Sequence, residues 1–533
     1  MPNHQKPNLN ERQHEAVTHG NGPLLIAAGA GSGKTRTLTS RVLHLLASGV
    51  DPSTIIAITF TNKAAKEMRK RIADSEWQAK HNGPIPFIGT FHSLGVQILK
   101  EEATRVGRTA HFTIFDDDDS QSLIKSLLKE MQLSGDRFNP YAVSAAISRI
   151  KNELLDPEEY AAGGKYESVI ASVYAKYEAE LLKSNAFDFD DLLEKVVRIF
   201  QREPDVLEKY RSRWHYILVD EFQDVNTNQY LFIKLLAQKH QNLFVIGDDA
   251  QSIYAFRGSD FRNFLNFEKD WPNARVITLD ENYRSTRNII NAASALIKFN
   301  KQQKPKNLWT NNQEGEPIHV LACQNAEEEA LAVTERIREA LRAGEPYTEI
   351  AILYRTNAQS RALEQALIRG GIPYEIFGGL KFYARKEIKD IIAALRYAHN
   401  PNDRAAKERI EKTFLKATRL MLLETLPRLA GELTHIELIN YFLEQAEYVE
   451  FLAKHFKNPD ERIDNIKELI HYAAEFPNAH DFLEQVTLLS SGDGRPKLQE
   501  NAIKLMTIHL AKGLEFDRVF IVGANEGLLP HER

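Results

Sequence analysis

The amino-acid sequence predicts an α/β protein with two parallel-sheet domains, each carrying a helical insertion. Short runs rich in Ile and Val alternate with segments of helical periodicity, which is typical of parallel α/β units. These runs fall into two sets along the 533 residues, and a chain of this length is expected to form several domains. Two long helix-rich stretches without convincing strand alternation interrupt the sets.

Each set is expected to contain five strands. In the first set the predicted strands are Leu24–Ala27, Ile55–Phe60, Tyr216–Val219, Leu243–Gly247 and Val276–Leu279. In the second set they are His319–Ala322, Ile350–Tyr354, Tyr374–Phe377, Lys504–Ile508 and Val519–Val522.

The helix-rich stretches set the predicted domain boundaries. We expect the first sheet domain at 1–102 and 209–287, with its helical insertion at 103–208. The second sheet domain is expected at 288–386 and 500–533, incomplete at its C-terminal end, with an insertion at 387–499. The polar stretch 301–315 contains Pro305 and is predicted to be a loop early in the second domain.

Composition favours a globular protein of the cytoplasm. Hydrophobic residues make up 43% and charged residues 26%, which is ordinary for such proteins. The single cysteine, Cys323, excludes internal disulfides and fits a reducing compartment. We find no apolar run long enough to span a bilayer and no N-terminal signal, so no membrane association is expected. The net charge of −5 argues against a coat of basic residues but not against a narrow basic groove.

Two motifs indicate a site that hydrolyses ATP. The first is the turn Ala28-Gly29-Ala30-Gly31-Ser32-Gly33-Lys34-Thr35, between an apolar run and a helical segment. Its backbone N–H groups and Lys34 bind phosphates, while Thr35 is a ligand for Mg²⁺. The second motif begins with Asp220 and Glu221, which suit the outer shell of the metal and a general base for water. Either motif alone is a weaker signal, because Ala28 replaces the usual first glycine and Asp-Glu pairs are frequent on surfaces.

Further residues are candidates for the rest of this site. The Gln13 amide suits the adenine edge, although an exposed glutamine at a helix start is the structural alternative. Gln251 follows a strand end, where a γ-phosphate sensor is expected. Tyr283 is suited to stack on a base, and Arg284 to neutralise the charge on the phosphoryl oxygens in the transition state. The alternative is that Arg284 forms a salt bridge at an interface and Tyr283 belongs to a core. Glu515 follows another strand and is placed to reach a ribose hydroxyl.

At this point the chain resembles a known family. Nine motifs stand in the order typical of UvrD/Rep/PcrA superfamily 1A DNA helicases: AGAGSGKT, TFTNKAA, GTFHSL, FDFDDLL, DEFQD, GDDAQSIYAFRG, ENYRS, YRTNAQSR and TIHLAKGLEF. The resemblance runs from about Leu9 onward and implies two RecA-like domains. It also implies the nucleotide contacts: adenine at Gln13 and Tyr283, phosphate and Mg²⁺ at Gly31 to Thr35 with Asp220, the general base at Glu221, the γ-phosphate at Gln251 and Arg284, and a nucleotide-facing Arg36.

Residues beyond the strand ends are candidates for binding single-stranded DNA. Such binding needs aromatic platforms for bases and donors for phosphates. The candidates are Phe60, Thr61, Asn62, His92, Phe189, Tyr254, Phe256 and Arg257 in the first half, and Arg355, Asn357 and His509 in the second. Each aromatic residue taken singly is more often part of a core. The short distance along the chain from Gln251 to Tyr254 is informative, because one loop then carries a phosphate sensor and a base platform.

The resemblance implies an ATP-dependent DNA helicase or translocase that moves 3′ to 5′ on single-stranded DNA. Its substrates are expected to be single strands and single-strand/duplex junctions, and its partners to be repair or replication proteins. We expect a monomer or weak dimer. Members of the family continue beyond the motif at Thr507 into one with a second γ-phosphate arginine, so we expect this chain to be a fragment with reduced turnover.

Two alternatives stay open at this point. The first is a regulatory module that binds ATP and DNA without hydrolysis, although Lys34 and Glu221 speak against it. The second is the helicase subunit of a helicase–nuclease.

Overall fold

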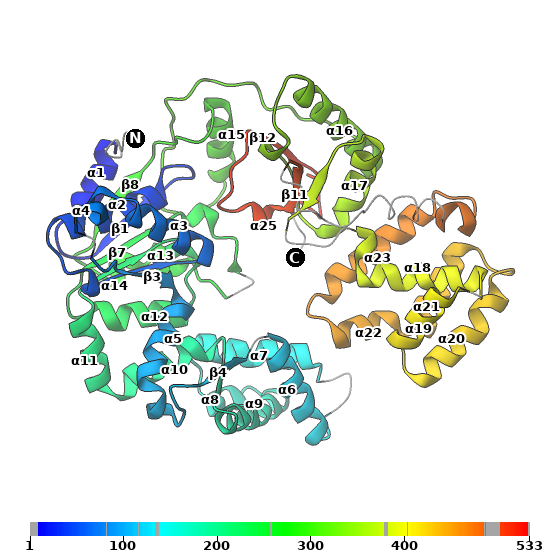
Figure 1. Cartoon of the computed structure of the whole chain (residues 1–533), viewed down its shortest axis with the longest axis horizontal. Helices are drawn as coiled ribbons and strands as arrows, with labels where there is room; N and C mark the ends of the chain where they lie inside the picture. Colours follow the sequence, from blue (N-terminus) through cyan, green and yellow to red (C-terminus); the bar gives the residue numbers. More distant parts are fainter. Residues whose placement is uncertain are drawn as a thin grey trace. The chain divides into compact units, whose positions relative to one another are not determined.

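The computed structural model describes residues 9–81, 83–115, 117–133, 138–255, 258–377, 382–401, 403–483, 486 and 501–530. The chain forms two compact units, Met1–Ile318 and His319–Arg533, which are described separately (Figure 1). Among the described residues, no helix is long and apolar enough to cross a membrane. The four-part domain division expected from the sequence stays a prediction.

The first unit is built around a six-stranded parallel sheet with the order β3-β2-β6-β7-β1-β8. Its strands are β1 (Leu24–Ala28), β2 (Ile55–Thr59), β3 (Phe87–Thr90), β6 (Tyr216–Val219), β7 (Leu243–Gly247) and β8 (Arg275–Leu279). All five predicted strands of the first set are present within one residue at each end. The sixth strand, β3, is short, contains Gly89 and was not among the predicted strands.

Helices cover both faces of this sheet, as the continuous burial of its central strands requires (Figure 1). On one face, Leu24 and Ile26 pack against α1 (Glu11–Thr18), α2 (Lys34–Ala47) and α3 (Asn62–Ala73). On the other face, Leu25 and Val245 join a core with α5 (Phe91–Glu102), α10 (Asp191–Arg202), α11 (Pro204–Arg213) and α12 (Thr227–Ala237). The shorter helices of the sheet region are α4 (Glu76–His81), α13 (Arg262–Leu265) and α14 (Phe267–Asp270), and α15 (Arg287–Ile297) follows β8.

The first predicted helical insertion contains helices and one small sheet. Its helices are α6 (Asp117–Glu130), α7 (Pro140–Glu153), α8 (Pro157–Ala161) and α9 (Lys165–Lys183). The expectation of no strands here was wrong, because β4 (Thr113–Phe115) pairs in parallel with β5 (Ala186–Asp188). Strands of three residues are too short to show alternation in the sequence.

The second unit contains a four-stranded parallel sheet with the order β10-β11-β9-β12. The strands are β9 (Ile350–Tyr354), β10 (Tyr374–Ile376), β11 (Ile503–Thr507) and β12 (Arg518–Ile521), and α16 (Ala326–Arg342) and α17 (Ser360–Arg369) pack on the sheet. The short helix α25 (Ile508–Ala511) follows β11. The predicted strand His319–Ala322 was wrong, because these residues are exposed and form no strand.

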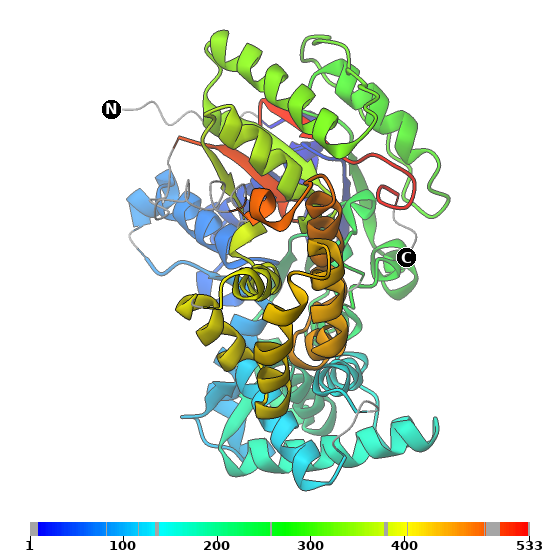
Figure 2. The same ribbon diagram turned by 90° about the vertical axis from the view of Figure 1, so that its right-hand side faces the viewer.

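A bundle of helices follows β10 in the second unit. It consists of α18 (Lys386–His399), α19 (Arg404–Thr413), α20 (Lys416–Leu429), α21 (His435–Gln445), α22 (Tyr448–His455) and α23 (Pro459–Ala473). Figure 2 shows these helices in yellow and orange. Their apolar side chains form a core of their own. Both units thus combine a parallel sheet with a helical insertion, which confirms the predicted α/β fold class.

Candidate functional site

The phosphate-binding turn lies between β1 and α2. Gly31 and Gly33 have φ angles of +65° and +82°, a left-handed conformation that favours glycine. Gly33 is the N-cap residue of α2 and has no side chain with which to cap this helix end. A Cβ atom at Gly31 would lie 2.5 Å from Asn282 Nδ2, so the turn excludes larger residues. The backbone N–H groups and the positive end of the helix dipole therefore form an anion-binding site.

Side chains from two neighbouring segments hold this turn. Gln13 Nε2 donates to the carbonyl oxygen of Ser32 over 2.8 Å, and Asn282 Nδ2 donates to that of Ala30 over 2.6 Å. Gln13 is buried, and its Oε1 accepts from the N–H of Asn10 over 3.1 Å. The nitrogen and the oxygen of the Gln13 amide can each form one more hydrogen bond, which a contact with adenine would require. That contact stays a prediction.

Asp220 lies buried at the carboxyl end of β6, beside the first turn of α2. Its Oδ2 lies 3.4 Å from the Thr35 hydroxyl, and its Oδ1 accepts from the N–H of Glu221 over 3.0 Å. Burial and the charge of Glu221 raise the pKa of Asp220 to about 7, although Lys34 works in the opposite direction. The positive charge near Asp220 is thus too small to offset burial and the charge of Glu221, and the Thr35 hydroxyl lies beside the carboxylate. This pair of oxygen ligands fits Mg²⁺, which binds oxygen atoms and takes only one or two ligands from the protein.

Glu221 is held in an unusual conformation. Its φ of +50° is left-handed, which is strained for a residue with a side chain. Gln223 Nε2 donates to Glu221 Oε2 over 2.6 Å, and Gln223 Oε1 accepts from the N–H of Asp248 over 2.8 Å. The buried Gln223 therefore orients the predicted general base and joins it to the loop after β7.

We call residues 248–254 the sensor loop. Gln251 ends a short 3₁₀ helix, and its Nε2 donates to Asp248 Oδ2 over 2.7 Å. Three residues later, the ring of Tyr254 stacks on Phe60, with centroids 5.5 Å apart and planes at 16°. Phe60 directly follows β2, so the sensor loop joins the nucleotide side of the sheet to an aromatic pair.

Tyr283 and Arg284 follow β8 and lie next to the phosphate-binding turn. The Tyr283 ring is 44% exposed, and its hydroxyl donates to Glu281 Oε2 over 2.7 Å and accepts from Asn10 Nδ2 over 2.7 Å. Burial of its hydroxyl and the charge of Glu281 raise the pKa of Tyr283 to about 12, while Arg36 works in the opposite direction. A fixed and exposed ring of this kind suits a base platform. A Cβ atom at Gly31 would lie 2.9 Å from Arg284 Cβ, so Arg284 borders the turn.

The strand order explains why these residues converge. β1 lies between β7 and β8, and β6 lies next to β7. Since all these strands are parallel, their carboxyl ends lie at one edge of the sheet, where ligands of open α/β sheets bind. The structure thus gathers these predicted nucleotide residues of the first unit: Gln13, Ala28 to Arg36, Asp220, Glu221, Gln251, Tyr283 and Arg284. Glu515 belongs to the second unit, where it is exposed.

The predicted DNA-binding residues of the first unit include a second aromatic pair. The ring of His92 meets that of Phe189 edge to face, with centroids 6.0 Å apart. Phe187 is buried within β5, whereas Phe189 lies just beyond the end of that strand and is 48% exposed. Burial lowers the pKa of His92, so its ring is neutral at pH 7 and offers a surface rather than a charge. Thr61 caps α3 and Asn62 begins it, and both are exposed. Phe256 and Arg257 lie outside the described residues.

Two of the three predicted DNA-binding residues in the second unit lie together. Arg355 NH1 is 3.4 Å from His509 Nδ1, at the ends of the neighbouring strands β9 and β11. Asn357 instead donates to Glu461 of α23. Asn357, which follows β9, thus connects the sheet to the helical bundle.

Sequence reasoning gave no role to three residues that shape the site. Asn282, Gln223 and Asp248 are all buried and hydrogen-bonded to residues with predicted roles. All three stand inside the motifs that were recognised. A polar residue within such a motif is the signal that could have identified them, since buried polar groups are almost always hydrogen-bonded.

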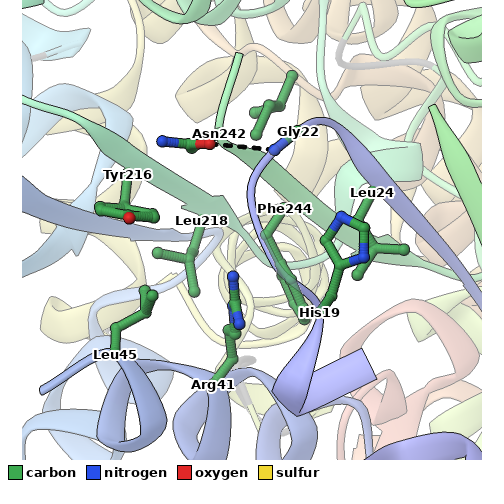
Figure 3. A pocket seen from close by; sticks show the side chains of 10 residues that line it. His19, Gly22, Leu24, Arg41, Leu45, Tyr216, Leu218, Asn242 and Phe244 are labelled. Carbon is green, nitrogen blue, oxygen red and sulfur yellow. Dashed lines mark hydrogen bonds between the residues drawn. The ribbon is translucent and has the colours of Figure 1, made fainter. Parts of the chain in front are cut away.

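A small pocket, which we call the cavity, lies at the opposite edge of the sheet (Figure 3). It is lined by Leu24, Tyr216 and Leu243, the first residues of β1, β6 and β7. The Arg41 guanidinium projects into it and donates to the carbonyl oxygens of Val17 and Gly20 over 2.9 Å each. The cavity is therefore separate from the phosphate-binding turn.

The fold and site define a P-loop nucleotide-binding protein of the parallel α/β class. The profile of the UvrD/REP helicase N-terminal domain matches residues 9–272, and that of the UvrD-like helicase C-terminal domain matches 277–459 and 434–533. The chain therefore belongs to the UvrD-like helicases, as the sequence motifs predicted, with two RecA-like domains.

The chain is similar along almost its whole length to curated relatives. A protein of Bacillus subtilis, described as ATP-dependent DNA helicase PcrA, is 42% identical over 98% of this chain and 78% of its own length. A protein of the same description from Staphylococcus epidermidis is 40% identical over 99% of this chain and 79% of its own. One from Staphylococcus aureus is 39% identical over 98% and 78%.

Proposed function

We propose that this chain is an ATP-dependent DNA helicase that moves 3′ to 5′ along single-stranded DNA and opens single-strand/duplex junctions. It acts in the cytoplasm with repair or replication proteins, as a monomer or weak dimer. Three relatives described as ATP-dependent DNA helicases support the use of ATP and DNA. The polarity and the process follow from the family resemblance.

The residues of the phosphate-binding turn and its neighbours have different roles in ATP hydrolysis. Lys34 and the turn's N–H groups bind the phosphates, while Thr35 and Asp220 hold Mg²⁺. When bound, Mg²⁺ neutralises charge that develops on the phosphoryl oxygens. Glu221, oriented by Gln223, positions the attacking water and accepts its proton.

The remaining nucleotide contacts come from residues around this centre. Gln13 and Tyr283 bind the adenine, Arg36 faces the nucleotide, and Glu515 binds the ribose. Arg284 and Gln251 contact the γ-phosphate and stabilise the charge of the transition state.

One observation carries the proposal that hydrolysis drives movement. Gln251 and Tyr254 share the sensor loop, and the Tyr254 ring stacks on Phe60. A change in contact between Gln251 and the γ-phosphate therefore displaces an aromatic ring that is available to a base. The other proposed DNA contacts are Thr61, Asn62, His92, Phe189, Phe256, Arg257, Arg355, Asn357 and His509.

The test is strand displacement on duplexes that carry a single-stranded tail at the 3′ or the 5′ end. We expect ATP-dependent displacement with the 3′ tail only, ATP turnover stimulated by single-stranded DNA, and loss of both in Lys34→Ala. Nucleotide and DNA binding without turnover would instead support the regulatory module. Shortened strands on a denaturing gel would indicate a nuclease.

A further inference from the structure

A segment of the first unit crosses the nucleotide edge of the sheet and contacts three of its loops. We call residues 304–312 the strap; they follow α15 and precede Ile318, the last residue of the first unit. The N–H of Lys304 donates to Asp249 Oδ2 over 2.8 Å, and the N–H of Trp309 donates to the carbonyl oxygen of Asp280 over 3.1 Å. A Cβ atom at Gly29 would lie 2.0 Å from Leu308 Cδ2, so Leu308 covers the phosphate-binding turn.

Lys306 is the charged residue at the centre of the strap. Its Nζ lies 2.8 Å from Asp248 Oδ1 and also contacts Asp249. The Lys306 side chain is 6% exposed, and those of Asp248 and Asp249 are 2% and 1% exposed. Burial works to lower the pKa of Lys306, but the two carboxylates outweigh burial and raise it. Lys306 is therefore a buried cation that pairs with two buried carboxylates.

Asp248 connects this ion pair to the residues proposed for hydrolysis. Its Oδ2 accepts from Gln251 Nε2 over 2.7 Å, and its N–H donates to Gln223 Oε1 over 2.8 Å. Gln223 in turn donates to Glu221 over 2.6 Å. Lys306 thus lies two contacts from the proposed γ-phosphate sensor and three from the proposed general base.

We propose that Lys306 is a positioning residue for ATP hydrolysis, which holds Asp248 so that Gln251 and Glu221 face the γ-phosphate and the attacking water. This inference rests on the function proposed above and extends it to the strap. A buried ion pair is weak as a source of stability, because desolvation offsets much of its attraction, but it fixes geometry. Loss of that geometry slows hydrolysis while the turn at Gly31 to Lys34 still binds the diphosphate.

The experiment compares Lys306→Met, Lys306→Arg and the matched control Lys304→Met. The Lys304 ammonium pairs with Glu268 and not with the sensor loop, so the control removes a strap cation without touching Asp248. For each protein we would measure DNA-stimulated ATP turnover, and the Kd of ADP and of a non-hydrolysable ATP analogue.

For Lys306→Met we expect kcat to fall about 10- to 100-fold, in line with small misplacements of catalytic groups. The affinity for the ATP analogue should fall relative to that for ADP, since only the analogue has a γ-phosphate. Lys306→Arg keeps the charge and the fold, and should show the same selective loss to a smaller degree. Lys304→Met should match the wild type in all three quantities.

The two proposals fail in different ways. A wild-type chain without DNA-stimulated turnover would overturn the proposed function. An active wild type with Lys306→Met and Lys306→Arg indistinguishable from Lys304→Met would overturn only the role of Lys306. Equal losses of affinity for ADP and the analogue would also overturn it, because they indicate general damage to the site.

Discussion

The phosphate-binding turn depends on single side chains that come from distant parts of the sequence. Asn282 is the clearest case, because its Nδ2 donates to Ala30 and its Oδ1 accepts from the N–H groups of Arg284 and Ser285. One buried amide therefore fixes the turn and the segment of the predicted γ-phosphate arginine together. The local motifs do not reveal this hydrogen bond, because Asn282 and Ala30 lie about 250 residues apart in the sequence and come together only in the folded chain.

We expect Asn282→Ala to weaken nucleotide binding about 10-fold, because the Ala30 carbonyl loses its donor and the turn loses a support. Titration with a fluorescent ATP analogue measures the effect. Asn288→Ala is the matched control, since Asn288 also donates to a backbone carbonyl, that of Gly315, but away from the turn. Equal affinities in both variants and the wild type would show that Asn282 does not shape the site.

At the scale of elements, periodicity predicted the strands that are buried on both sides and failed elsewhere. Tyr216–Val219 and Leu243–Gly247 were predicted with their observed bounds, because continuous apolar runs are typical of central parallel strands. His319–Ala322 is also a short run with apolar residues, but it forms no strand with any of the described residues. The polar stretch 301–315 was predicted as a loop early in the second domain; it forms no helix or long strand, but it belongs to the first unit. Its ion pairs with the sensor loop depend on tertiary contacts that no local pattern encodes.

Helix α17 of the second unit carries a buried ionisable group, Glu364. Glu364 is buried, and its Oε1 accepts from the Ser360 hydroxyl over 2.7 Å and from the N–H of Phe382 over 3.1 Å. Burial raises the pKa of Glu364 from 4.5 to about 7. The folded protein therefore retains a proton that the unfolded chain has already released between these values.

The stability of the chain relative to Glu364→Gln should therefore fall as the pH rises from about 4.5 to 7 and stay level above 7. The shift corresponds to at most about 3 kcal/mol in the free energy of unfolding. Urea unfolding of both proteins at several pH values measures this difference. Glu335→Gln, at a surface glutamate, is the control and should show no trend. A constant difference between wild type and Glu364→Gln from pH 5 to 8 would contradict the assignment.

At the scale of the whole molecule, each unit combines a parallel sheet with a helical insertion, and this organisation was predictable from the sequence. The order of motifs was sufficient to identify the family, because many residue types at fixed positions are jointly specific. The hydrogen bonds among the nucleotide-site residues of the first unit were less predictable from the sequence. Gln13, for example, was expected to face adenine, and that contact stays a prediction; what the structure shows is a hydrogen bond from its amide to the phosphate-binding turn.

The central claim is that the sensor loop couples ATP hydrolysis to a grip on DNA bases through Tyr254. The most direct measurement is the ATP turnover of Tyr254→Ala with and without single-stranded DNA, compared with Tyr166→Ala. Tyr166 also stacks on a phenylalanine, Phe138, but outside the sensor loop. We expect Tyr254→Ala to keep its DNA-independent turnover and to lose about 10-fold or more of the DNA stimulation, because a stacked base contributes about 1–3 kcal/mol. Undiminished DNA stimulation in Tyr254→Ala would contradict the account.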